Sequence, residues 1–147
     1  MNSKNRKSAA RLFAVQALFQ MEAAGSGLED VVAEFLTHRF GAPEEDREWL
    51  EGHVDLFETL TKEAVIHQAR IDQATNAALV DRWPISRIDP TLRAIFRAGG
   101  AELIAGDAPA KVVMSEYIDI TKDFFPEGKE AGLVNAVLDV MAKELRA

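Results

Sequence analysis

Apolar residues recur every three or four positions along almost the whole chain. In an α-helix of 3.6 residues per turn, positions with this spacing share one face, which a globular protein buries. No run of strict alternation between turn residues indicates a strand. The pattern therefore predicts an all-α fold, and its clearest stripe consists of Leu50, His53, Phe57, Leu60 and Ala64.

Seven helices are expected, and the residues between them are those that end or begin helices. Glycine favours the turn after a helix, proline presets the first helical turn, and carboxylates stabilise a helix N-terminus. Because Pro84 disfavours a helical conformation at Trp83, the fourth helix should end there. The third helix should begin near Pro43, and the other expected ranges are about 3–24, 28–40, 71–82, 91–105, 110–124 and 129–145.

The connections between these helices are short, and neither a low-complexity linker nor an internal repeat interrupts the chain. Short connections are typical of helical bundles. A chain of 147 residues is also large enough to bury a core without disulfides or a structural metal. We therefore expect one compact helical bundle.

Composition is typical of a reducing, aqueous compartment. The chain contains no cysteine, which excludes disulfides, thiolate metal sites and cysteine nucleophiles. The polar, basic start lacks the apolar core of a secretory signal, and no run approaches the roughly 18 apolar residues of a membrane span. We expect a soluble cytoplasmic protein.

Basic residues gather at the start of a chain that is acidic as a whole. The formal net charge is −7, which argues against general affinity for nucleic acid, because neutralised phosphates supply most non-specific binding. Any RNA site must therefore be local. Lys4, Arg6, Lys7 and Arg11 all precede the first acidic residue, Glu22.

Three of these cations, Lys4, Lys7 and Arg11, fall on one stripe of the first helix at about 100° per residue. The stripe continues into apolar residues, so we expect the first two turns to project from the core with their cations exposed to phosphates. The alternative is a solvated helix end whose charges have no function, because such clusters are common.

Gly99 and Gly100 lie inside the fifth expected helix. Two glycines there cost on the order of 1.5–2 kcal/mol relative to alanines. Close packing of another helix backbone is the favoured explanation, and a ligand against the bare backbone is the alternative.

No motif indicates catalysis or the binding of a metal or cofactor. The three histidines lack the spacing of a zinc site, and the chain has no Gly-rich phosphate loop or nucleophile elbow. No sequence feature holds its carboxylates in the closed site that acid–base catalysis requires. We expect no enzymatic activity, no metal and no cofactor.

Four segments have the character of family signatures. The first segment, residues 11–19, runs from a basic start into a core helix, and the second, residues 92–97 with Glu102, is a Leu-Arg-rich helix. The third and fourth segments are residues 113–118 and 133–139, and Lys122 and Phe124 lie between these two. In order and spacing, these segments resemble the NusB family of transcription antitermination factors over essentially the whole chain.

This resemblance implies a single RNA-binding domain of two packed helical subdomains, about residues 1–69 and 70–147. It implies binding of single-stranded boxA RNA in nascent ribosomal transcripts together with NusE, a ribosomal small-subunit protein, within the antitermination complex of RNA polymerase. Family members occur as monomers and as dimers, which leaves a homodimer open. The implied RNA-binding residues are Lys4, Arg6, Lys7, Arg11, Gln16, Phe19, Lys122 and Lys129, and the implied NusE-binding residues are Arg87, Leu92, Arg93 and Glu102.

The chain departs from the family pattern in the last helix, where Leu133 and Ala136 stand at positions usually held by Phe and Gly. A flat aromatic able to stack on a base is therefore missing there. Two other classes are weighed. One is the isolated NusB-like domain of a ribosomal RNA cytosine methyltransferase, although no cofactor-binding half follows the last signature. The other is a helical adaptor that binds only protein, which an absence of RNA binding at low salt would favour.

Overall fold

The computed structural model describes residues 3–40, 47–79 and 88–146, with the side chains of all of these except 3–5 and 47–53. The described residues form helices and contain no strand, which confirms the all-α fold. The helices are α1 (Ser3–Ala24), α2 (Leu28–His38), α3 (Arg47–Ile66), α4 (Gln68–Leu79), α5 (Pro90–Ala105), α6 (Ala110–Phe124) and α7 (Glu130–Leu145). No described helix is long and apolar enough to cross a membrane.

Both expected ends agree with the structure for α1 and α6, and one end agrees for α2, α5 and α7, whereas the other described ends that were expected differ by one to three residues. The largest difference is at α4, which begins at Gln68 rather than at Ile71. The chain there turns only at His67, whose backbone N–H still donates to Glu63 O at 2.9 Å, so α4 follows α3 almost directly. The expected start of the third helix near Pro43 and the expected end of the fourth near Trp83 lie outside the described residues.

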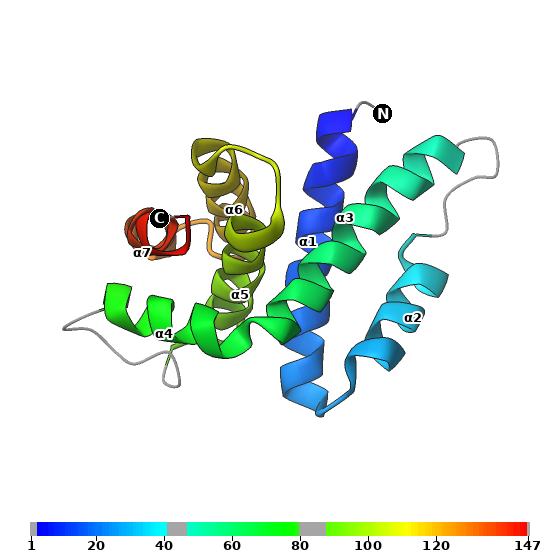
Figure 1. Cartoon of the computed structure of the whole chain (residues 1–147), viewed down its shortest axis with the longest axis horizontal. Coiled ribbons are helices and arrows are strands. Elements are labelled where there is room, and N and C mark those ends of the chain that lie inside the picture. The colour runs from blue at the N-terminus through cyan, green and yellow to red at the C-terminus, as the bar shows by residue number, and fades with distance from the viewer. Residues whose placement is uncertain (1–2, 41–46, 80–87, 147) are drawn as a thin grey trace.

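Helix α1 lies at the centre of the molecule and contributes to two hydrophobic clusters. It packs against α3 and α5, with α2 on one side and α4 to α7 on the other (Figure 1). One cluster joins Ala10, Ala14 and Ala17 of α1 to the phenylalanines of α2 and α3. The other joins Val15 and Leu18 of α1 to α4 through α7. The expected division into subdomains at residue 69 stays a prediction.

The paired glycines of α5 are packed tightly, as expected, although against side chains rather than a helix backbone. A Cβ at Gly100 would lie 2.6 Å from Ile71 Cγ2 of α4 and 3.2 Å from Met141 Cε of α7. A Cβ at Gly99 would lie 3.1 Å from Leu138 Cδ2 of α7. Glycine therefore lets α4 and α7 approach α5 closely.

Arg146, which follows α7, covers the C-terminal end of α5. Its Nε donates to Leu103 O at 2.7 Å, and its Nη2 lies 3.3 Å from both Glu102 O and Gly106 O. Carbonyl groups at a helix C-terminus carry partial negative charge and lack intrahelical partners, so a guanidinium is favourable there. The end of α7 and the end of α5 are thus held together.

Candidate nucleic-acid interface

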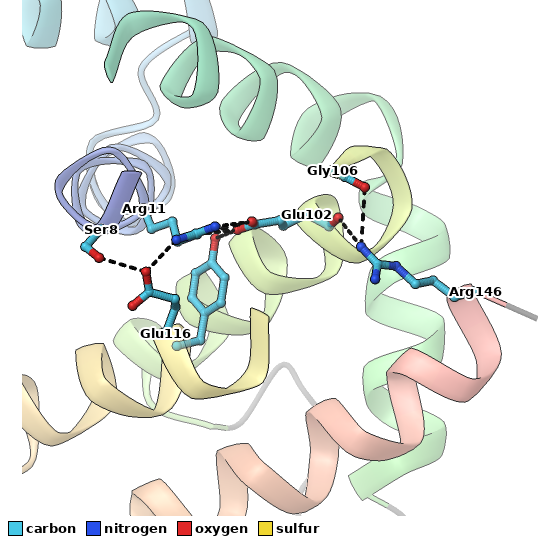
Figure 2. A network of polar contacts seen from close by, with 7 residues as sticks. Ser8, Arg11, Glu102, Gly106, Glu116 and Arg146 are labelled. Carbon is cyan, nitrogen blue, oxygen red and sulfur yellow. Dashed lines mark hydrogen bonds and ion pairs between the residues drawn. The ribbon is translucent and has the colours of Figure 1, made fainter. Parts of the chain in front are cut away.

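A buried network of charged side chains joins α1 to α5 and α6 (Figure 2). Arg11 of α1 donates from Nε and Nη2 to the two carboxylate oxygens of Glu102, at 2.8 and 2.7 Å, and from Nη1 to Glu116 Oε1 at 2.5 Å. Ser8 donates to the same Glu116 oxygen at 2.7 Å. Charge-assisted hydrogen bonds therefore hold the first half of α1 against both neighbouring helices.

Tyr117 of α6 completes the network, because its hydroxyl donates to Glu102 Oε1 at 3.0 Å. Burial and the charge of the Glu102 carboxylate raise the pKa of Tyr117 well above its ordinary value. Burial alone would lower the pKa of Arg11, but the hydrogen bond and the charge of Glu102 outweigh it, so the pKa of Arg11 is raised. The tyrosine therefore remains a donor and the arginine remains charged.

This network corrects the expectation that Arg11 is exposed to RNA phosphates. Arg11 is 3% exposed, and its guanidinium is occupied by Glu102 and Glu116. Lys7, one turn earlier, is exposed, and Arg6 is half-buried, with its Nε buried and without a hydrogen-bond partner. Lys7 and Arg6 remain candidates, whereas the side chain of Lys4 lies outside the described residues.

Lys7 lines a groove of about 620 Å³ between the start of α1 and the start of α6. Lys111 stands on the α6 side, and two carboxylates, Glu116 and Asp119, also line the groove. Its charge is therefore mixed, so it offers a phosphate two cations but not a uniformly positive surface.

A second hollow, of about 490 Å³, is formed by the second half of α1 together with the end of α2 and the end of α6. We call it the aromatic pocket. Phe19 of α1 and Phe124 of α6 line it and are 39% and 40% exposed. Its lining residues are Val15, Gln16, Phe19, Gln20, Ala23, Ala24, Phe35, Arg39, Thr91 and Phe124. Two exposed rings beside a hollow are what a stacked base requires.

Four polar side chains also line the aromatic pocket, namely Gln16, Gln20, Arg39 and Thr91. The Oε1 atom of Gln16 is buried and has no hydrogen-bond partner in the structure, although leaving such an atom unsatisfied costs about 1–3 kcal/mol. Arg39 at the end of α2 lies with its guanidinium carbon 5.2 Å from the centre of the Phe35 ring. The pocket thus offers a ligand aromatic faces and a cation, whereas the Gln16 oxygen is itself buried.

The structure brings together some of the implied RNA-binding residues and separates others. Gln16 and Phe19 meet in the aromatic pocket, but at about 100° per residue they lie roughly 180° and 120° around α1 from Lys7. Lys122 is exposed in the last turn of α6, two positions before Phe124, and Lys129 is exposed at the start of α7. The groove at Lys7 and the aromatic pocket therefore open on different sides of α1.

Arg39 and Phe124, which also line the pocket, were not among the expected site residues. Phe124 carried a signal, because it stands at the family spacing, whereas Arg39 lies in no motif. It is the ending of α2 beside α1 that brings Arg39 to the pocket, and the sequence gives no direct sign of that contact.

The implied NusE-binding residues that the structure describes are buried in the isolated chain. Leu92, Arg93 and Glu102 are 6%, 9% and 1% exposed. Arg93 donates to Glu22 of α1 and to Ile88 O, and Glu102 belongs to the network with Arg11. Arg93 and Glu102 thus hold helices together, and the assignment of these residues to NusE stays a prediction. Arg87 lies outside the described residues.

The family model of NusB proteins matches residues 8–143 of this chain. The chain belongs to the NusB family. Similar relatives include transcription antitermination protein NusB of Rhodopseudomonas palustris (strain BisB18), 46% identical over 144 residues, which are 97% of this chain and 85% of the relative. The corresponding protein of Maricaulis maris (strain MCS10) is 47% identical over 148 residues, 98% of this chain and 92% of the relative.

Solved NusB structures have the same fold. NusB of T. maritima is 26% identical, with a TM-score of 0.72 over 94% of this chain and 91% of that chain. A chain in the crystal structure of antitermination factors NusB and NusE in complex with dsRNA is 23% identical, with a TM-score of 0.75 over 95% of this chain and 98% of that chain. The resemblance inferred from the sequence is thus confirmed, and the NusB fold accounts for the arrangement of the seven helices.

Proposed function

We propose that this chain is a transcription antitermination factor that binds single-stranded boxA RNA of nascent ribosomal transcripts together with NusE. The proposal assigns it to the cytoplasm, without catalytic activity, as part of the antitermination complex of RNA polymerase. Family membership supports the proposal, because the relatives are named transcription antitermination proteins. A NusB structure that contains NusE and dsRNA supports the two partners.

The aromatic pocket is the observation that carries the RNA proposal at the level of residues. Single-stranded RNA is recognised by proteins through unstacked bases that lie against aromatic rings and pair with side-chain amides. Phe19 and Phe124 supply the rings, and Gln16, which also lines the pocket, supplies an amide. A duplex would keep its bases stacked on one another and unavailable to these rings.

A cation in the pocket completes the proposed surface. Arg39 lines the pocket, whereas Lys122, two positions before Phe124, lies about 200° around α6 from it. Because the whole chain carries a charge of −7, phosphate binding by the isolated chain should be weak, and the proposed basic partner should strengthen it. NusE is therefore expected to add affinity as well as specificity.

The test is a fluorescence anisotropy titration of a labelled boxA-like RNA and a scrambled RNA, each with and without NusE. We expect weak binding of boxA by the chain alone and tighter binding with NusE. Coupling free energies are reciprocal, so RNA should tighten NusE binding by the same factor, roughly 5- to 150-fold for a typical coupling. NusE binding without any RNA binding at low salt would instead favour a protein-binding adaptor.

A further inference from the structure

The charged network and the aromatic pocket depend on the same pair of helices. Phe19 and Gln16 stand on α1, and Phe124 stands on α6, so the width of the pocket depends on how α1 lies against α6. Earlier along both helices, Ser8 and Arg11 of α1 both donate to Oε1 of Glu116 on α6. Glu116 therefore links the two helices that carry Gln16, Phe19 and Phe124.

Hydrogen bonds to two carboxylates hold the Arg11 side chain in one position. Its other two donors are bound by Glu102, whose side chain is 2% exposed and is also fixed by the Tyr117 hydroxyl. Bidentate arginine–carboxylate pairs constrain geometry as well as contributing energy. The Arg11 side chain thus transmits the position of α5 and α6 to α1.

We propose that Arg11 is a positioning residue of the RNA-binding surface, which acts through Glu116 and Glu102 to set α1 against α6 and so shape the aromatic pocket. The inference rests on the proposed function, since it concerns binding of RNA in that pocket. The competing explanation is that Arg11 leaves its carboxylates when RNA arrives and contacts a phosphate directly.

These two explanations predict opposite effects for Glu116→Gln. If Arg11 contacted phosphate, the substitution would release it from a carboxylate and remove a negative charge, so RNA affinity would rise. If Arg11 positions α1, the substitution weakens its link to α6, so RNA affinity falls. Substitutions that act without touching the ligand change affinity by roughly 2- to 30-fold, and a fall within this range is expected.

Asp119→Asn is the matched control for charge. Asp119 stands on the same helix, lines the same groove and is exposed, and the substitution changes the net charge by the same amount as Glu116→Gln. Removing one negative charge from a nucleic-acid-binding surface should leave the affinity unchanged or raise it slightly. A fall with Glu116→Gln alone therefore cannot come from charge.

Arg11→Lys is the second variant, which keeps the inference testable if Glu116→Gln does not fold. Lysine keeps the positive charge and can contact a phosphate as a point charge, but it cannot form the bidentate pair with Glu102. Positioning by Arg11 therefore predicts a loss of RNA affinity, whereas direct contact predicts near-parental affinity. The salt slope shows where any loss of affinity comes from, because a loss caused by one missing phosphate contact should flatten the slope by about 0.7, whereas a loss of positioning should leave it unchanged.

Each variant needs a measurement showing that the fold persists and the network has changed. Helicity and melting temperature report whether the fold persists. Tyr117 is the only tyrosine of the chain, so the ultraviolet absorbance of tyrosinate reports the network directly. A fall in the pKa of Tyr117 toward its ordinary value of about 10 would show that water has entered the network.

The experiment is an anisotropy titration of the boxA-like RNA with the full chain, its three variants and a salt series. Weaker binding by Glu116→Gln and Arg11→Lys at an unchanged salt slope, with Asp119→Asn at parental affinity or above, is expected. Binding by Glu116→Gln that equals or exceeds that of Asp119→Asn, or parental binding by Arg11→Lys, would overturn the positioning role alone. A parent chain that binds no RNA would instead remove the proposed function and this inference with it.

Discussion

Arg11 on α1 and Glu102 on α5 form a bidentate ion pair from which solvent is almost excluded. The two residues are 91 positions apart in the chain, and the guanidinium and carboxylate meet at 2.8 and 2.7 Å. Each charge loses its hydration on burial, and that loss offsets much of the attraction between them. The net stabilisation by the pair should therefore be small, and we expect its main effect to be on which face of α1 meets α5.

Removing only the cation should be far more costly than removing both charges. Arg11→Met leaves the Glu102 carboxylate buried without its main partner, and breaking a buried pair in this way typically costs about 3–5 kcal/mol. Arg11→Met combined with Glu102→Leu should recover a large part of that loss. Urea unfolding of the parent, both single variants and the double variant measures the coupling. Additive effects of the two substitutions would contradict a shared buried pair.

Tyr117 should make stability depend on alkaline pH. Its pKa is raised in the folded protein, so the unfolded chain loses the phenol proton first, near pH 10. The stabilisation is then complete below that pH and is lost as pH rises above it, by about 1.4 kcal/mol per pH unit until the folded-state pKa is reached.

Tyr117→Phe removes this titration and is the test of its size. The difference in unfolding free energy between the parent and Tyr117→Phe should be constant at neutral pH and should shrink as the pH rises above about 10. Lysines titrate in the same range, but they are common to both proteins and cancel in the difference. A difference that stays constant through alkaline pH would contradict the raised pKa.

The helices were predictable because local signals agree with the tertiary structure. Gly25 after α1 has a φ of +68°, a conformation that glycine adopts without strain, and Asp89 accepts from the Thr91 backbone N–H at 2.7 Å before α5. Both features are local and legible in the sequence. The start of α4 was missed because only one residue, His67, separates α3 from α4, so no glycine or proline marks the boundary.

The role of Arg11 was not predictable from its spacing alone. The interval from Lys7 to Arg11 shows that the two residues share a stripe, but it does not show where the core ends along that stripe. Arg11 is buried because Glu102 and Glu116, about a hundred positions later, supply its partners. Long-range pairing of this kind leaves no periodic signal, and for the same reason Arg39 was not assigned to the aromatic pocket.

The glycines of α5 should respond to alanine according to the space around them. Gly100→Ala should destabilise the fold by about 1–3 kcal/mol through overpacking against Ile71, despite the better helix propensity of alanine. Gly99→Ala should cost less, because its nearest neighbour is the flexible end of Leu138.

Gly132 of α7 is the control for helix propensity. A Cβ there would meet nothing within 4 Å, so Gly132→Ala should stabilise the protein by up to about 1 kcal/mol. Thermal or urea unfolding of the three alanine variants gives the order of their stabilities. Equal effects at Gly100 and Gly132 would show that packing does not decide the choice of glycine in α5.

The aromatic pocket and the cations should contribute to RNA binding in separable ways. Phe19→Ala and Phe124→Ala should each weaken binding of a boxA-like RNA by about 1–3 kcal/mol, the usual contribution of a stacked base, without altering the salt slope. Lys7→Gln should instead flatten the slope by about 0.7 if Lys7 contacts one phosphate of a single strand. Val140→Ala is the control, since Val140 is an exposed apolar residue of α7 that does not line the pocket.

The measurement is RNA affinity across a series of salt concentrations for the parent, the four variants and the double variant of Phe19→Ala with Lys7→Gln. Because the pocket and Lys7 lie on different sides of α1, one RNA strand must pass around that helix to reach both. If it does, Phe19→Ala and Lys7→Gln will combine additively, as is usual for well-separated sites. If the strand reaches only the pocket, Lys7→Gln will leave both affinity and slope at parental values. Parental affinity in both phenylalanine variants would rule out the pocket as the place where a base is bound.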